Sequence, residues 1–316
     1  MLIGTLIGAG YATGREVSQY FGRANPLTMV VAGVAIALLS MLFLWVGRQG
    51  EPKGKWLKVY QALLSVFAVL SCGVMLSAGS SLLGGAWTPL VLGLAGVAIA
   101  ATDKLFHFAN LLAVPLLVVL VLAVLPSATP QPFGTGFLVG SALNYAGMNL
   151  LFEGELLRKE GRDMSPRAIV IAGVIIAAVM TFLLLAMRRM VGDSPSALPF
   201  AKVCIVEGKE VVVKCVIVTA ILTNIAGAMR LVPDGFAPLP KGVSVASALA
   251  VSFVIGGVAF EDLVRTVYPV MGWAGVAVGV LYALWGLAGC KKYPLRGFAR
   301  QKWRKRGIDT PAPHGL

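Results

Sequence analysis

Apolar residues dominate ten stretches of this chain, and polar or turn-forming residues separate the stretches. They are residues 2–21, 27–45, 59–83, 87–101, 105–125, 137–157, 168–187, 211–231, 243–260 and 267–289. Most approach the roughly 20 residues that a helix needs to cross a hydrocarbon core of about 30 Å. Backbone in lipid must satisfy its own hydrogen bonds. The pattern therefore predicts an all-α membrane protein of about ten transmembrane helices.

The composition points the same way. Of the 316 residues, 58% are hydrophobic and 13% are charged, whereas soluble domains carry about 25% charged residues. The mean hydropathy is +0.84. These values exclude a disordered chain, a coiled coil and an ordinary water-soluble enzyme. They leave the lipid bilayer as the expected surroundings.

The distribution of charge predicts the orientation. The net charge is +13, and eight Lys and Arg residues lie in the tail, 290–316. With a cytoplasmic N-terminus, the inner loops and tail together hold 19 Lys and Arg, and the outer loops hold 7. Basic residues gather on the cytoplasmic side, so we expect both ends to be cytoplasmic, in a multi-pass protein of the cell (inner) membrane. The transmembrane domain is then 1–289, followed by a basic tail, and no nucleic-acid-binding module is recognisable.

The first apolar stretch is unusually rich in glycine and charge for a lipid-facing helix. The residues concerned are Gly4, Gly8, Gly10, Gly14, Arg15 and Glu16. A dinucleotide fingerprint is excluded, because no strand precedes the glycines and no βαβ unit follows. Two interpretations remain. The glycines form helix-packing faces, or the helix is broken and its unpaired backbone groups bind solutes and ions.

The sixth stretch has a comparable interruption, in the segment 140–149. The sixth stretch is the first of the second five, just as stretch 1 is the first of the first five. Interruptions at matching positions of two halves mark transporter sites. The pattern thus predicts broken helices 1 and 6 around a bound solute. The candidate solute-binding residues are Gly8, Ala9, Gly10, Thr13, Asn144, Tyr145, Gly147 and Asn149.

Five spans in each half is an odd number, so the two halves must enter the membrane with opposite topology. This is the geometry of an inverted repeat, with a site near the bilayer midplane. The expected repeats are about 1–130 and 131–289. Between spans 7 and 8 lies an outer segment, in which 199–206 is either a short capping helix or a plain loop.

The run 4–17, GTLIGAGYATGREV, resembles the opening motif of the YkvI-type bacterial membrane proteins. The segments 144–149 and 264–273 look like the span-6 and span-10 motifs of that group. The group in turn resembles the amino acid–polyamine–organocation superfamily, whose members share the LeuT fold. The resemblance runs along nearly the whole chain and implies transport, but it names no ligand.

The resemblance also implies a sodium site between spans 1 and 8, and hard cations do prefer oxygen ligands. The matching positions are Gly4, Ile7, Ala220, Thr223 and Asn224. The alternative for Thr223 and Asn224 is ordinary interhelical hydrogen bonding. Span 5 has no internal lysine, which favours sodium over a lysine-type proton mechanism. Only about 10 Å of helix fits before Gly8, so either the true start lies upstream or the inner gate is short.

Three charged residues are candidates for gating or coupling. Arg15 and Glu16 form either an outer gate or a local pair that reaches for the interface. Glu153 follows Asn149 by one helical turn and so faces the same pathway. It is a proton-coupling candidate, or it marks the cytoplasmic end of its helix near Arg158.

The function predicted from these features is secondary active transport. We expect Na⁺- or H⁺-coupled symport of an amino acid or related small amine by alternating access. The alternative is a passive channel or a non-transporting sensor on the same scaffold. No nucleotide-binding loop, nucleophile elbow, zinc-protease motif or C-x-x-C pair is present. We therefore expect neither an enzyme nor a cofactor, and no metal beyond Na⁺.

Overall fold

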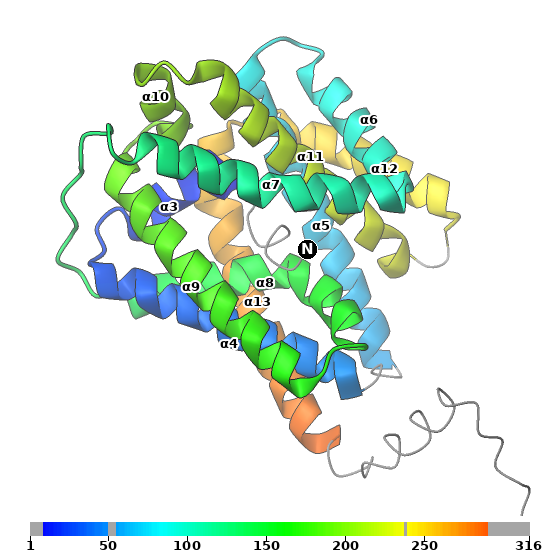
Figure 1. Cartoon of the computed structure of the whole chain (residues 1–316). Helices are drawn as coiled ribbons and strands as arrows, with labels where there is room; N and C mark the ends of the chain where they lie inside the picture. The colour runs from blue at the N-terminus through cyan, green and yellow to red at the C-terminus, as the bar shows by residue number, and fades with distance from the viewer. Residues whose placement is uncertain (1–8, 50–54, 237–238, 290–316) are drawn as a thin grey trace, which may run out of the picture.

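The computed structural model describes residues 9–49, 55–236 and 239–289. Throughout these ranges the regular structure is helical, and one isolated bridge joins Ala24 to Gly136. The helices are α2 (Ala9–Ala12), α3 (Arg15–Phe21), α4 (Pro26–Gln49), α5 (Lys55–Leu83), α6 (Thr88–Ala101), α7 (Asp103–Val124), α8 (Val139–Gly161), α9 (Pro166–Val191), α10 (Pro199–Val206), α11 (Glu210–Gly235), α12 (Lys241–Gly256) and α13 (Phe260–Gly289) (Figure 1).

Within the described ranges, six helices are long and apolar enough to cross a membrane: α4, α5, α7, α9, α11 and α13. Two shorter apolar helices, α6 and α12, occupy predicted spans 4 and 9. Spans 1 and 6 correspond to α2 with α3 and to α8. A multi-pass helical membrane protein is therefore confirmed, and the count of ten crossings stays a prediction.

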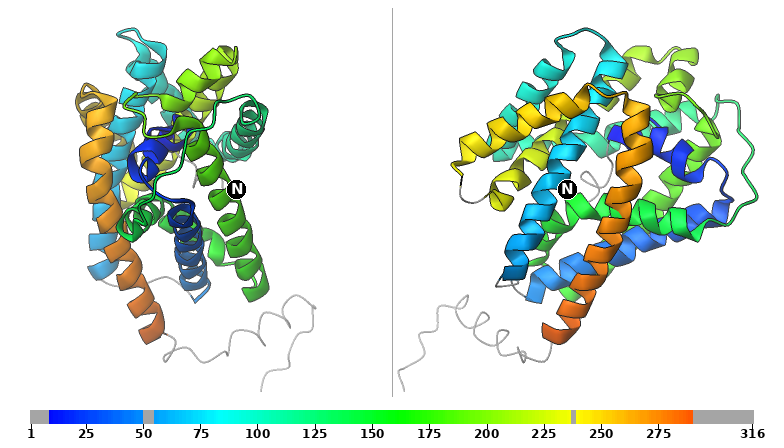
Figure 2. Two further views of the ribbon diagram at one scale, coloured as in Figure 1. Left: turned by 90° about the vertical axis from the view of Figure 1, so that its left-hand side faces the viewer. Right: turned by 180° about the vertical axis from the view of Figure 1, so that it is seen from behind.

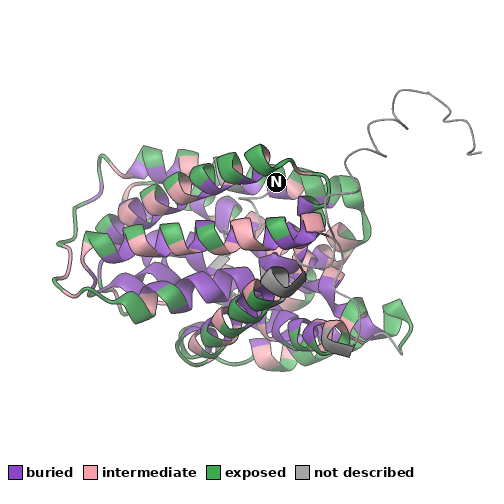
Figure 3. Ribbon diagram, turned by 90° about the horizontal axis from the view of Figure 1, so that it is seen from below, coloured by how far each residue is buried: buried purple, intermediate pink, exposed green. Residues whose placement is uncertain are grey.

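The outward faces of the helices support this assignment. Buried residues face the inside of the helical assembly, and exposed ones face outward (Figure 3). Many exposed side chains are large and apolar, among them Leu38, Val174, Val254 and Leu281. Soluble proteins avoid large exposed apolar surfaces, so this surface suits contact with lipid.

The helices pack in two groups. In one group α4 packs against α8 and α9, and α3 contacts α8 and α9. In the other, α5 packs against α11 and α12, and α6 packs against α11. The long helix α13 lies against α8 and also contacts α4 and α5 (Figure 2).

The predicted break in span 1 is confirmed, at Thr13 and Gly14. Gly14 separates α2 from α3 and has φ of 78°, a left-handed conformation that glycine adopts without strain. The carbonyl of Thr13 is freed from the helix and accepts a hydrogen bond from the amide of Phe200, at 2.9 Å. This hydrogen bond connects span 1 to α10. The sequence left open whether 199–206 is a short helix or a loop, and the structure shows the helix Pro199–Val206.

The predicted break in span 6 is wrong. Residues Val139–Gly161 form one continuous helix, α8, through both asparagines and the central glycine. The amide of Asn149 donates to the carbonyl of Tyr145 one turn earlier, at 2.8 Å, so this polar side chain bonds inside the helix. A cluster of polar and small residues is compatible with an intact helix when a neighbouring helix packs closely on it.

Candidate functional site

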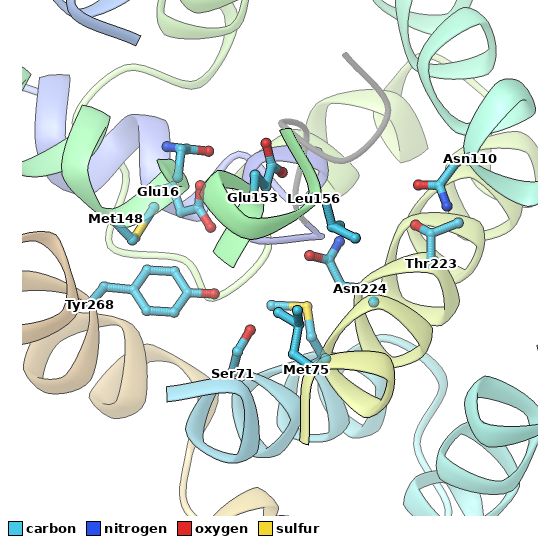
Figure 4. A pocket seen from close by; sticks show the side chains of 14 residues that line it. Glu16, Ser71, Met75, Asn110, Met148, Glu153, Leu156, Thr223, Asn224 and Tyr268 are labelled. Atoms are coloured by element: carbon cyan, nitrogen blue, oxygen red, sulfur yellow. The ribbon is translucent and has the colours of Figure 1, made fainter. Parts of the chain in front are cut away.

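A cavity of about 50 Å³ lies where the two groups of helices meet (Figure 4). Its lining comes from α3, α5, α7, α8, α11 and α13. The described lining residues are Glu16, Ser71, Met75, Asn110, Met148, Asn149, Glu153, Leu156, Thr223, Asn224, Gly227, Ala228, Leu231 and Tyr268. A water needs about 10–15 Å³ of such space. The cavity in this conformation therefore has room for a few waters and is too small for a solute of amino-acid size.

Glu16 reaches the cavity because of the break in span 1. It lies in the first turn of α3 and is buried, with 3% of its surface exposed. Its carboxyl group folds back over Gly10, where any Cβ would collide with it. The hydroxyl of Tyr268, on α13, donates a hydrogen bond to the same carboxyl. Gly10 therefore makes room for Glu16, a role that differs from direct ligand binding.

Glu153 lines the same cavity from α8 and is 5% exposed. Its Oε2 atom has no hydrogen-bond partner among the described residues. Glu153 and Glu16 lie close enough for their charges to interact. Asn149 also lines the cavity, so these two residues face the same cavity, and their role in a transport pathway stays a prediction. Arg158 pairs with Glu155 through two hydrogen bonds of 2.8 and 2.6 Å.

The α11 side of the predicted sodium site lies at the cavity. Thr223 and Asn224 line it, and both donate to the carbonyl of Ala220, at 3.0 and 2.8 Å. The other two predicted ligands, Gly4 and Ile7, lie outside the described residues, as does the solute candidate Gly8. The sodium site therefore stays a prediction.

The two charged residues at the start of α3 point in different directions. The guanidinium group of Arg15 donates to the carbonyls of Ser194 and Ser196, at 3.1 and 3.2 Å, while Glu16 faces the cavity. The expectation of a local Arg15–Glu16 pair is therefore wrong. Ser18 adds two hydrogen bonds to the backbone of Ser194. Together these contacts fasten α3 to the segment between α9 and α10.

Several predicted solute-binding residues pack away from the cavity. Asn144 donates to the carbonyl of Pro269 on α13, at 2.9 Å, and Gly147 touches the backbone of the same helix. Tyr145 is fully buried against Tyr20 and Phe21, with ring centroids 5.4 and 5.2 Å away. These residues lie among helix contacts and are absent from the described cavity lining.

Thr13 bonds within the break of span 1. Thr13 is buried, and its hydroxyl donates to the carbonyl of Gly10 at 2.8 Å and accepts from the amide of Arg15 at 3.3 Å. It thus stabilises the break itself. Ala9 is the first residue of α2. Thr13 is not among the described residues that line the cavity.

Sequence reasoning missed two polar groups of the lining. Asn110 lies on α7, donates to the carbonyl of Phe106 at 2.9 Å and leaves its Oδ1 atom without a partner in the described structure. Tyr268 contacts Glu16 from α13. The available signal was a single amide, at position 110, inside an otherwise apolar stretch, because such groups are expensive in a membrane unless they face a cavity.

The fold and the cavity define a multi-pass helical membrane protein with a polar internal site. No family model matches the chain. Over 93% of its length the chain is similar to the uncharacterized membrane protein YkvI of Bacillus subtilis (strain 168), at 22% identity and covering 95% of that protein. It is also 23% identical to the uncharacterized protein YyaD of the same organism, over 86% of this chain and 91% of YyaD. The predicted resemblance to the YkvI-type membrane proteins is thereby confirmed.

Proposed function

We propose that this membrane protein is a secondary active transporter. It would couple the uptake of a small amine or amino acid to Na⁺ or H⁺ by alternating access. The observation that carries the proposal is the cavity, which lies between the two groups of helices and has two buried carboxyl groups in its wall. Ionisable groups inside a membrane protein are costly and typically mark ion or substrate pathways.

The packing of the helices supports a LeuT-like inverted repeat as the scaffold. In such a repeat α5 corresponds to α11, and α6 corresponds to α12. The contact between α5 and α12 then has its mate in the contact between α11 and α6, and both contacts are present. The contact between α13 and α5 likewise has its mate between α7 and α11. Rocking of α3, α4, α8 and α9 against the other group would open the cavity to each side in turn.

The buried carboxyls and the α11 oxygens support different coupling ions. Glu16 and Glu153 can each take up a proton, while Thr223 and Asn224 supply oxygen atoms of the kind that Na⁺ prefers. In this conformation both α11 side chains donate to the carbonyl of Ala220. These hydrogen bonds compete with the binding of a cation by that carbonyl. We therefore place the first test on the carboxyl groups.

Transport itself is tested in liposomes that contain the purified full chain. Labelled amino acids and their matching amines are offered with the same unlabelled solute inside. A carrier exchanges the two pools, so an internal solute accelerates entry of the label. A channel gives entry without acceleration, and a sensor gives neither, so either result would contradict the proposal.

We expect Glu153→Gln to lower uptake driven by an inward proton gradient at least about tenfold. The amide keeps the shape of the side chain but cannot bind and release the coupled proton. Uptake is measured against Glu160→Gln, which removes a carboxylate from the exposed end of the same helix. Equal proton-driven uptake in both variants would remove Glu153 from the coupling mechanism.

A further inference from the structure

The chemistry of the cavity wall restricts the solute more narrowly than the scaffold does. Two of the described lining residues carry a carboxyl group, Glu16 and Glu153. The other described polar lining residues are neutral: Ser71, Asn110, Asn149, Thr223, Asn224 and Tyr268. Lys, Arg and His are absent from this described lining. A bound guest therefore meets neutral polar groups and two carboxyl groups, and no basic side chain of the described lining.

The two carboxyl groups are not neutralised by the basic residues next to them in sequence. Arg15 donates to the carbonyls of Ser194 and Ser196, and Arg158 forms its bidentate pair with Glu155. Around Glu16 the neighbouring ionisable groups are tyrosines, Tyr268 among them, and the carboxyl of Glu153. The site thus has two carboxyl groups without a basic partner among the described residues that line the cavity.

A second observation points to a ligand at this place. The Oε2 atom of Glu153 is buried without a hydrogen-bond partner in the described structure, and so is the Oδ1 atom of Asn110 on α7. Native proteins rarely leave buried acceptors unpaired. A bound solute that donates hydrogen bonds would pair these two acceptors and explain why the protein leaves them unpaired.

The intact helix α8 presents no helix end at its centre that could bind a solute carboxylate. A broken span 6 would have presented free N–H groups and a positive dipole end. In the structure α8 runs unbroken past the cavity, and Glu16 itself occupies the first turn of α3. A carboxylate on the guest would face two carboxyl groups and would find no basic side chain in the described lining to pair with.

We propose that the solute is a small organic ammonium ion without a carboxylate. Its ammonium group binds between Glu16 and Glu153, and its alkyl part lies against Met75, Met148 and Leu156. This inference rests on the proposed transport function and specifies the solute. An inorganic cation gains nothing from contact with methionine and leucine side chains. The apolar part of the wall therefore favours an organic ammonium ion over an inorganic cation.

The test compares each amine with the amino acid that carries the same side chain. The pairs are ethylamine with alanine, isoamylamine with leucine, and cadaverine with lysine. Binding to the purified full chain is measured as the rise in melting temperature over a range of concentrations, in a buffer without primary amines. We expect at least one amine to stabilise the protein at a concentration at least about tenfold below its amino acid partner.

Variants locate the binding. Glu16→Gln and Glu153→Gln should each raise the concentration of amine needed at least about tenfold, whereas Glu160→Gln should leave it unchanged. Glu153→Asp keeps the carboxyl group and should preserve the preference for amine over amino acid. If both glutamine variants fail to fold, the comparison of the two solute classes on the unaltered chain decides alone.

Failure of this inference differs from failure of the transport proposal. Stabilisation and exchange by the amino acids but not by the amines would overturn the inference and leave a transporter. Stabilisation by amines with no exchange in liposomes would support the binding site and overturn transport. No stabilisation by any of the six compounds would overturn the ammonium site.

Discussion

Replacing Arg188 with methionine is expected to destabilise the protein severely. Arg188 lies near the end of α9 and is 2% exposed. Its guanidinium group donates to the carbonyls of Phe21, Gly22 and Pro132, at 2.8, 2.6 and 2.9 Å. One side chain thus closes the C-terminal end of α3 and holds the segment that precedes α8.

The size of the effect follows from the groups left behind. Each buried polar group that loses its partner costs about 1–3 kcal/mol, so three carbonyls put the loss on the order of 3–9 kcal/mol. That is a large part of the roughly 5–15 kcal/mol by which proteins are typically stable. We expect the melting temperature in detergent to fall by at least about 6 °C. Arg188→Lys should recover little of it, because an ammonium group lacks the planar fork.

Arg189→Met is the matched control, since the neighbouring arginine has the same charge but is exposed. Its melting temperature should stay near that of the unaltered chain. If Arg188→Met and Arg189→Met melt within about 2 °C of each other, the buried guanidinium does not hold these segments together.

The sequence predicted the helices well, because a membrane leaves the backbone few alternatives. Every predicted apolar stretch contains a helix in the structure, and span 10 begins earlier than predicted, at Phe260. The break at Gly14 was foreseen in the right span because glycine and charge rarely share a lipid-facing helix. The sequence could not show which carbonyl the break would free or that Phe200 would take it.

The site was predicted less well because polar residues in a helix have two uses that look alike in sequence. Asn149 and Asn144 both lie in the interrupted segment of span 6. One lines the cavity, and the other bonds to the carbonyl of Pro269. Only the position of α13 decides between them, and that position depends on packing between distant segments. For the same reason Tyr268 and Asn110 entered the site unpredicted.

Gly147→Ala is expected to force α8 and α13 apart. A Cβ built at Gly147 collides with the carbonyl oxygen of Gly272 and lies 2.7 Å from the amide nitrogen of Val276. Side-chain ends can turn aside, but these obstacles are the backbone of α13. The closeness is mutual, since a Cβ at Gly275 collides with the carbonyl of Gly147. Small residues at such crossings let helix backbones approach in membranes.

The expected cost is about 1–3 kcal/mol of overpacking, seen as a lower melting temperature in detergent. Gly140→Ala is the matched control on the same helix, because nothing lies within 4 Å of a Cβ there. That variant should keep or slightly raise stability, since alanine favours a helix by about 1 kcal/mol over glycine. Equal melting of the two variants would contradict the close crossing.

The same pair of variants separates the two roles assigned to Gly147. If Gly147 bound the solute directly, as the sequence indicated, alanine would weaken solute binding and leave the unliganded protein nearly as stable as before. If Gly147 is a packing residue, alanine lowers stability even without solute. Any loss of binding then follows from displacement of α8, which carries Asn149 and Glu153 into the cavity wall. Melting curves of Gly147→Ala with and without ethylamine therefore distinguish a glycine that contacts the guest from one that positions the helix beside it.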